Sequence, residues 1–291
     1  MNRERIKLEL KNIFRRELSQ NQKDYIKADL IKKLWINCYN DDENELSNSE
    51  DNEKLNFSRG SFDTLKFIGK EIVKIIKDNS LEQLQLVKIL WRKYGKEGRT
   101  ISIYILGQIH YENPETTLDF IKEVIKKCIS VEECDNISTK VIEPVALKDI
   151  DRYLKILDFW SKSENKWLRR SAMTVLGRIP MKKPIYTNKS LEIVKNCLCD
   201  IDNDVMKSVS LALRLSIRGN SNDLKIFIVN NAYDNNSSKI WIFTDFIINL
   251  NKKYLLEFHS QSSTYTNWYN KIDENNKVTL SKAIKVLSNN H

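Results

Sequence analysis

Apolar residues recur along most of this chain at the three- and four-residue spacing of amphipathic α-helices. Leu65, Ile68 and Ile72 form one such stripe. The same spacing predicts a first helix over about residues 3–18 and a second over about 22–38. Further along, the pattern predicts helices of roughly 12–18 residues that alternate with short polar corners. The sequence therefore reads as a succession of helices with little else.

The scarcity of turn-forming residues supports an all-α fold. The 291 residues include only 7 Gly and 4 Pro, too few for the many turns of a β-sandwich or β-barrel. Predicted helix pairs recur every roughly 35–45 residues, which is typical of HEAT-like solenoids. Small residues follow the predicted starts of three helices, at Gly107, Gly177 and Ala212, and these are expected where helices cross closely. We predict one solenoid domain over 1–291 with an irregular C-terminal helical repeat over 237–291; an irregular helical bundle is the alternative.

The distribution of charge favours a polyanionic partner. The formal net charge is +9, from 48 Lys+Arg and 39 Asp+Glu. Seven acidic residues lie in the Asn/Ser-rich stretch 41–57, and setting these seven residues aside leaves a net charge of +16 (9 + 7). The composition of 41–57 predicts an acidic mobile loop. Lysine-rich helices that are simply solvated would give the same excess of positive charge, and this alternative stays open.

Basic residues lie at similar places in successive predicted repeats, and such residues would line up along one surface of a solenoid. The candidate DNA-binding residues are Arg99, Lys166, Arg169, Lys207 and Arg214. A stripe of this kind can follow the backbone of a duplex, with an affinity that falls steeply as salt rises. The alternatives are a solvated face or salt bridges between repeats.

Several other classes of protein find no support in the sequence. The five cysteines include no CxxC pair and the three histidines are scattered, so neither a metal nor a cofactor is expected. The nucleotide-binding motifs GxGxxG and GxxxxGK[ST] and the hydrolase motifs GxSxG and HExxH do not occur. The N-terminus has no apolar signal core, and no apolar run approaches the roughly 20 residues that span a bilayer. A cytoplasmic protein is expected.

Two segments carry a resemblance to a known family. The first is Cys134-Asp135, and the second runs from Trp160 through Trp167-Leu168-Arg169-Arg170, with Arg170 thirty-five residues after Asp135 (170 − 135). Together they resemble the DNA alkylation repair glycosylases of the AlkD type, over roughly 60–232. The resemblance implies a HEAT-repeat fold that binds alkylated duplex DNA as a monomer. It also implies that Asp135 and Arg170 are the catalytic residues.

The resemblance further implies a chemistry without a metal or cofactor. In this family the N-glycosidic bond of a cationic alkylated purine is hydrolysed without flipping the base. Asp135 would stabilise positive charge on the sugar and assist a water, because a cationic leaving group needs no general acid. Arg170 would hold a backbone phosphate or orient the carboxylate.

The chain departs from the family at two positions. Val131 and Leu211 stand where the family has two tryptophans that contact the DNA backbone in the cleft. The alternative function is therefore a non-catalytic HEAT-repeat scaffold that binds DNA or protein. Asp135 exposed in a basic groove would favour the enzyme, and Asp135 in a buried ion pair would favour the scaffold.

Structural explanations compete with the functional ones for three features. Asp135 suits the N-cap of a helix that starts at Asn136. Trp160 and Trp167 suit core positions at a helix corner, while the two arginines after Trp167 point outward. An aromatic patch near the C-terminus packs a terminal helix or, alternatively, stacks on bases; it contains Tyr265, Trp268 and Tyr269.

Overall fold

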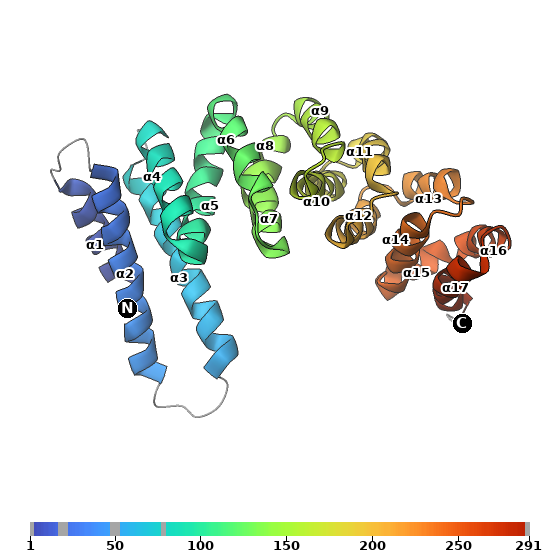
Figure 1. The fold of residues 1–291 in the computed structure, drawn as a ribbon, viewed down its shortest axis with the longest axis horizontal. Helices are drawn as coiled ribbons and strands as arrows, with labels where there is room; N and C mark the ends of the chain where they lie inside the picture. The colour runs from blue at the N-terminus through green and yellow to red at the C-terminus, as the bar shows by residue number, and fades with distance from the viewer. Residues whose placement is uncertain (1–2, 17–22, 47–52, 77–79, 289–291) are drawn as a thin grey trace. The chain divides into compact units, whose positions relative to one another are not determined.

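The computed structural model describes residues 3–16, 23–46, 53–76 and 80–288 (Figure 1). Every regular element in these ranges is a helix, which confirms the predicted all-α class. Within the same ranges, no helix combines the length and apolar character that crossing a membrane requires.

Contacts within the chain divide it into two compact units, 1–118 and 119–291, with the division inside α6 (Pro114–Lys126). Each unit is described by itself below. A stack of helical repeats makes contacts only between neighbours, so it can divide in this way between any two repeats. The single domain over 1–291 stays a prediction.

Unit 1 arranges its helices in two rows. Its helices are α1 (Arg3–Arg15), α2 (Lys23–Leu46), α3 (Glu53–Ile75), α4 (Ser80–Lys93), α5 (Gly95–Glu112) and the start of α6. One row is α1, α3 and α5, and the other is α2 and α4, with each helix packed on the next of its row. Apolar residues at helical spacing fill the space between the rows, and Ile68 and Ile72 of α3 are fully buried there.

The acidic stretch 41–57 is more helical than the sequence predicts. The helix α2 continues to Leu46, and α3 begins at Glu53 (Figure 1). Residues 41–46 and 53–57 are therefore helical, because both helices extend past the apolar stripes by which the sequence locates them. The middle of the predicted loop, 47–52, lies outside the described residues, and its mobility stays a prediction.

Unit 2 contains short helices joined by tight corners. They are α7 (Val131–Ile137), the π-helix η1 (Ser138–Ile142), α8 (Glu143–Ala146), α9 (Ile150–Ser161), α10 (Lys166–Lys182), η2 (Pro184–Tyr186), α11 (Thr187–Val194), η3 (Lys195–Cys197), α12 (Asn203–Ser216), α13 (Ser221–Asn231), α14 (Ser237–Ile248), α15 (Lys252–Phe258), η4 (His259–Gln261), α16 (Ser262–Tyr269) and α17 (Glu274–Ser288).

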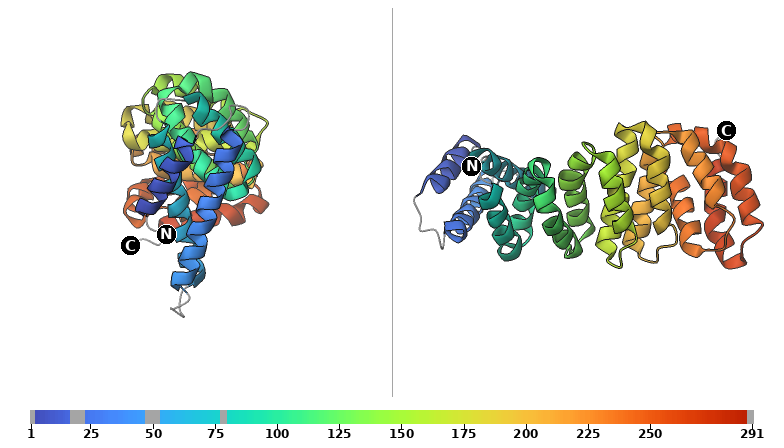
Figure 2. Two further views of the ribbon diagram at one scale, coloured as in Figure 1. Left: turned by 90° about the vertical axis from the view of Figure 1, so that its left-hand side faces the viewer. Right: turned by 90° about the horizontal axis from the view of Figure 1, so that it is seen from above.

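Two rows of helices run through unit 2 as well. We call α7, α10, α12, α14 and α17 the first row and α9, α11 and α13 the second; neighbours within each row pack on one another (Figure 2). Helices of the two rows also pack in pairs, α9 on α10 and α11 on α12. Alternation between two such rows is the helical-repeat arrangement that the sequence predicts.

Small residues set the closest approach in the first row. A Cβ on Gly177 of α10 would lie 2.6 Å from Cα of Ala212 on α12, so only glycine fits there. The sequence marked both residues as crossing points, and the structure confirms this pair. Leu168, Met173 and Leu176 are buried along the same α10.

The C-terminal aromatic residues belong mainly to the core. Tyr265 and Trp268 of α16 are fully buried, and the Trp268 indole Nε1 donates to the Asp234 carbonyl at 2.7 Å. Trp268 meets Phe243 edge to face, with ring centroids 5.8 Å apart. The packing alternative is therefore confirmed for both residues, whereas Tyr269 is half-buried.

Candidate functional site

The helix that carries Asp135 begins earlier than the N-cap alternative requires. Ser130 caps α7, because its hydroxyl accepts a hydrogen bond from the Glu133 amide at 3.2 Å. The Glu133 carboxylate in turn accepts from the Ile129 amide at 3.0 Å. Ser and Glu three residues apart are a capping box in sequence, and this signal was overlooked. Asp135 lies inside α7, so its interpretation as an N-cap is wrong and its carboxylate is available to other partners.

The corner between α9 and α10 forms where the sequence places it. Asn165 caps α10 by accepting from the amides of Trp167 at 3.0 Å and Leu168 at 3.3 Å. Trp160 is buried as predicted. Trp167 is only half-buried, with the Lys166 ammonium 4.6 Å from its ring centroid, so it is not the core residue that the sequence predicts.

A two-pronged ion pair joins Asp135 to Arg170 across the first row. Arg170 Nε donates to Asp135 Oδ1 at 2.9 Å, and Nη2 donates to Oδ2 at 2.6 Å. The Thr174 hydroxyl also donates to Oδ1, at 3.2 Å. The Arg170 side chain is 6% exposed and that of Asp135 is 31% exposed. The pair thus has a buried cation and a carboxylate that reaches the surface. This arrangement is intermediate between the two considered from the sequence, an exposed Asp135 and an Asp135 in a buried ion pair.

The third nitrogen of the Arg170 guanidinium, Nη1, makes a further hydrogen bond. It donates to the backbone carbonyl of Asp204, on the next helix of the row. With all three nitrogens bonded to protein oxygens and the side chain buried, Arg170 cannot hold a DNA phosphate in this conformation. Of its two predicted roles, the contacts support orientation of the carboxylate.

Additional hydrogen bonds hold α7 against α10. The Ser138 hydroxyl donates to the Cys134 carbonyl at 2.7 Å and accepts from the Ser171 hydroxyl at 2.8 Å, and all three residues are buried. The Cys134 thiol donates to the Trp167 carbonyl at 3.4 Å. These bonds flank Asp135 in sequence, so the helix that carries the carboxylate has little freedom to slide along α10.

A π-helical turn begins three residues after Asp135. In η1 the amide of Glu143 donates to the carbonyl of Ser138, five residues back. Such turns are rare in proteins overall, and those that occur are often found at functional sites. Beyond it, Arg178 Nε of α10 donates to the largely buried carboxylate of Glu143. Two carboxylates eight residues apart thus both pair with arginines of α10.

Arg169 does not point outward, as the sequence predicts, but forms a pair of its own. Its Nε and Nη2 donate to the two carboxylate oxygens of Asp200, at 2.6 and 3.1 Å. Its Nη1 donates to the carbonyls of Ser163 and Glu164, both at 2.8 Å. The hydrogen bond from Asp200 raises the pKa of Arg169. These contacts support the salt-bridge alternative for Arg169 over a DNA contact.

Two other predicted DNA-binding residues also form ion pairs. Lys166 Nζ lies 2.9 Å from Asp204 Oδ2, and this bond raises the pKa of Lys166 and lowers that of Asp204. Arg214 Nη1 of α12 lies 3.1 Å from Asp245 Oδ2 of α14. Both pairs link neighbouring helices of the first row. Lys166 keeps 37% of its side chain exposed, whereas Arg214 keeps 23%.

The remaining predicted residues lie apart from these pairs. Lys207 is exposed on α12, close enough to Asp204 to lower the pKa of that carboxyl. Arg99 belongs to unit 1, where its guanidinium lies 5.2 Å from the ring centroid of Trp91. At the positions of the two absent tryptophans, Val131 is half-buried and Leu211 is 37% exposed.

Comparison with known proteins identifies the family. A family model described as DNA alkylation repair enzyme matches residues 43–240, which is more than half of the chain. The chain belongs to the DNA alkylation repair enzyme family. No curated protein and no solved structure matches it.

The family match includes the whole Asp135–Arg170 site and supports a role in DNA alkylation repair, with DNA as the partner that the family suggests. It leaves out α1 and most of α2, together with the chain beyond 240. The predicted family is therefore confirmed, whereas the roles of single residues stay predictions.

Two residues of the site were missed in the sequence. Thr174 lies one helical turn after Arg170, a spacing that puts both on one side of α10 and could have revealed it. Asp204 contributes its backbone carbonyl, which leaves no signal in a sequence. Among the described residues, no group of three or more His, Cys, Asp or Glu is placed to hold a metal.

Proposed function

We propose that this protein is a DNA glycosylase that releases cationic alkylated purines from duplex DNA. The observation that supports it most is the half-exposed carboxylate of Asp135, fixed on both oxygens by the buried Arg170 guanidinium. An ionised carboxylate only accepts hydrogen bonds, and each bond described at Asp135 runs toward it. Its remaining exposed side is the part that can face a developing cation.

In the proposed reaction the bond between C1′ and the purine nitrogen breaks. Its electron pair goes to the alkylated base, which leaves neutral, and the sugar gains positive charge. The Asp135 carboxylate stabilises that charge because it is held in place before the reaction begins. A water then adds at C1′ and gives up a proton, so an abasic sugar and a free base result. The base leaves without being flipped into a pocket.

Arg170 is a positioning residue in this proposal. It touches Asp135 and the Asp204 carbonyl, and its burial keeps it from the DNA. Lys166 and Lys207 are the proposed phosphate contacts, since both are exposed near Asp204 on α10 and α12. Arg169 and Arg214 hold neighbouring repeats together. With two main phosphate contacts, duplex affinity would fall with salt by a slope near −2 on logarithmic axes.

Base release from methylated duplex DNA tests the proposal. Wild-type protein should release 3-methyladenine or 7-methylguanine above the spontaneous rate, and Asp135→Asn should lower the single-turnover rate by about 100-fold. Asp245→Asn is a matched control, because it breaks another Arg–Asp pair of the first row with a carboxylate of 25% exposure. Released base is measured by chromatography at a temperature where all three proteins are folded.

Two results would contradict the glycosylase. One is wild-type release no faster than the spontaneous rate at saturating protein; the other is an equal loss in Asp135→Asn and Asp245→Asn. Binding of the duplex without release would favour the non-catalytic scaffold. Leu211 supports that second function, because it presents an aliphatic side chain where the family has a tryptophan.

A further inference from the structure

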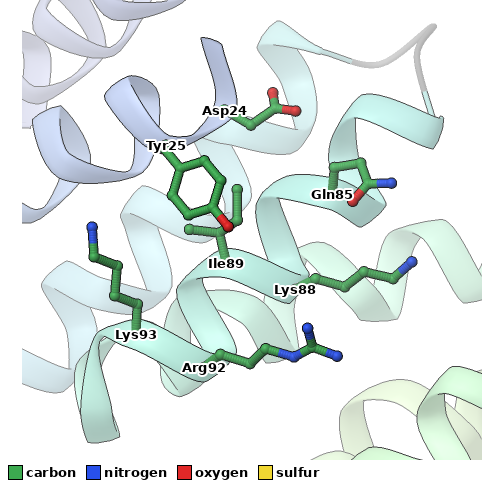
Figure 3. A pocket seen from close by; sticks show the side chains of 7 residues that line it. All are labelled: Asp24, Tyr25, Gln85, Lys88, Ile89, Arg92 and Lys93. Carbon is green, nitrogen blue, oxygen red and sulfur yellow. The ribbon is translucent and has the colours of Figure 1, made fainter. Parts of the chain in front are cut away.

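A hollow in unit 1 lies between the first turn of α2 and the exposed side of α4. Its volume is about 460 Å³, within the roughly 300–1,000 Å³ typical of small-molecule sites. It is lined by Asp24 and Tyr25 of α2 and by Gln85, Lys88, Ile89, Arg92 and Lys93 of α4 (Figure 3). The hollow is therefore large enough for one nucleotide.

Tyr25 gives this hollow an accessible aromatic wall. Its side chain is 54% exposed, which is unusual for a ring beside a helix–helix contact. The Lys93 ammonium lies 5.6 Å from the ring centroid. An exposed ring next to a cation is the combination with which proteins stack unpaired bases.

Two further cations line the hollow. Lys88 and Arg92 are one turn apart on α4, and Figure 3 shows both side chains extending toward the same side of the hollow. Together with Lys93 they outweigh Asp24, so the lining carries a net charge of +2 (3 − 1). Phosphate oxygens therefore suit this side of the hollow.

A second basic hollow of unit 1 is also lined in part by α2 and α4. It measures about 620 Å³, and its charged lining residues are two acidic ones, Glu71 and Glu82, and six basic ones, Lys7, Lys11, Arg15, Lys23, Lys27 and Lys74. Its charged lining has a net charge of +4 (6 − 2). Burial and the charge of Glu82, which lines the second hollow, raise the pKa of Asp24, which lines the first. Positive charge in unit 1 is therefore not confined to the hollow around Tyr25.

We propose that the hollow around Tyr25 binds an unpaired nucleotide of a DNA strand, with the base stacked on the tyrosine ring and its phosphates beside Lys88 and Arg92. A paired base is stacked within its duplex and cannot offer a face to a side chain in a hollow. Tyr25 lies before residue 43, outside the family match, whereas the cations of α4 lie within it. The proposed site shares no residue with the Asp135–Arg170 site, so its test does not depend on base release.

Binding of a fluorescein-labelled ten-residue oligothymidylate at low salt tests the site. Tyr25→Ala should weaken binding by about 5-fold to 150-fold, the range for loss of one stacked base, and Tyr25→Phe should bind like the wild type. Tyr111→Ala is the matched control, since Tyr111 is a 43%-exposed tyrosine of the same unit and should leave the affinity unchanged. Fluorescence anisotropy gives each dissociation constant.

The contribution of the cations of α4 is tested with a second pair of variants. Arg92→Gln should weaken oligothymidylate binding and make its salt slope shallower by about 0.7, the value for one single-strand phosphate contact. Arg218→Gln removes the same charge from an exposed position in unit 2 and should change neither. The same variants are titrated with a blunt-ended duplex, which has no unpaired loop and whose affinity Tyr25→Ala should leave unchanged.

Three outcomes overturn the proposal. They are no oligothymidylate binding by folded wild-type protein, equal effects of Tyr25→Ala and Tyr111→Ala, and equal losses of affinity for the blunt-ended duplex and the single strand in Tyr25→Ala. The last would make the hollow a contact for the backbone of a duplex.

Discussion

Two adjacent arginines of α10 each grip a carboxylate with two nitrogens, yet the two pairs face opposite ways. In the Arg170–Asp135 pair the guanidinium is 6% exposed and the carboxylate 31% exposed. In the Arg169–Asp200 pair the order is reversed, with 17% for the guanidinium and 6% for the carboxylate. The same residue types at neighbouring positions therefore present opposite partners to solvent.

The difference shows why an ion pair alone does not identify a site. Asp200 is enclosed and also accepts from the Asp202 amide at 3.0 Å, so its carboxylate braces the corner before α12. The Asp135 carboxylate is held by the buried Arg170 guanidinium and is exposed to solvent on its other side. A buried charge whose partner is removed is costly, whereas a charge that reaches water is not. The loss of stability on replacing either arginine therefore depends on how deeply the remaining aspartate is buried.

The largest loss of stability is expected for Arg169→Met. This change leaves the buried Asp200 carboxylate without its cation, which costs about 3 kcal/mol of unfolding free energy. Base release should persist at temperatures below the lowered midpoint, because the pair lies apart from Asp135. Thermal denaturation and release assays on the same preparation measure both. If Arg169→Met kept the wild-type stability but lost base release, the roles assigned to the two arginine–aspartate pairs would be reversed.

A smaller loss of stability is expected for Arg170→Met. The stranded carboxylate of Asp135 already reaches water, so the cost is about 1–2 kcal/mol, mainly from lost hydrogen bonds. Single-turnover release should fall by about 10-fold or more because Asp135 is no longer held. Duplex affinity should stay at the wild-type value, since the guanidinium is buried. A weakened duplex affinity in folded Arg170→Met would restore the phosphate role.

The smallest effect is expected at Lys166–Asp204, where both partners are about one-third exposed. Lys166→Met should cost less than about 1 kcal/mol at neutral pH. The hydrogen bond from Lys166 lowers the pKa of Asp204 from its ordinary 3.8. The pair therefore stabilises the fold fully above that value and loses its effect as pH falls through the lowered pKa.

Denaturant unfolding of wild type and Lys166→Met over a range of pH measures this difference. The two stabilities should converge in acid. A difference that grows as pH falls would show that Lys166 stabilises the fold through another contact, such as its position over the Trp167 ring.

The sequence predicted the helices well because their signals are local. The spacing of Ile68 and Ile72 and the helix corner between Trp160 and Trp167 each depend on a few neighbouring residues. Gly177 and Ala212 were placed at a crossing for the same reason, since small side chains mark close approach. The ends of α2 and α3 were missed, because these helices continue into a polar stretch that offers no apolar stripe.

For the candidate site, the sequence indicated which residues to consider but not how they are arranged. Family resemblance singled out Asp135 and Arg170, but nothing near them in sequence says which is buried. Their partners come from distant parts of the sequence: Asp135 of α7 lies 35 residues before Arg170, and Asp200, in the corner before α12, lies 31 residues after Arg169. Contacts of that range arise from the packing of the first row, so no local pattern encodes the direction of either arginine. Trp167 was misplaced for the same reason.

The π-helical turn after Asp135 has a consequence for changes in chain length. A regular α-helix would rotate Glu143 by about 80° from Asp135 over eight residues, whereas one extra residue in the turn leaves about 20°. Deleting one residue within 138–142 would convert the turn to an α-turn and leave the two carboxylates seven residues apart, which keeps the offset between them at about 20°. This segment should therefore accept the deletion of one residue with both ion pairs to α10 intact, and a one-residue alignment gap placed here would keep Asp135 and Glu143 aligned with their counterparts.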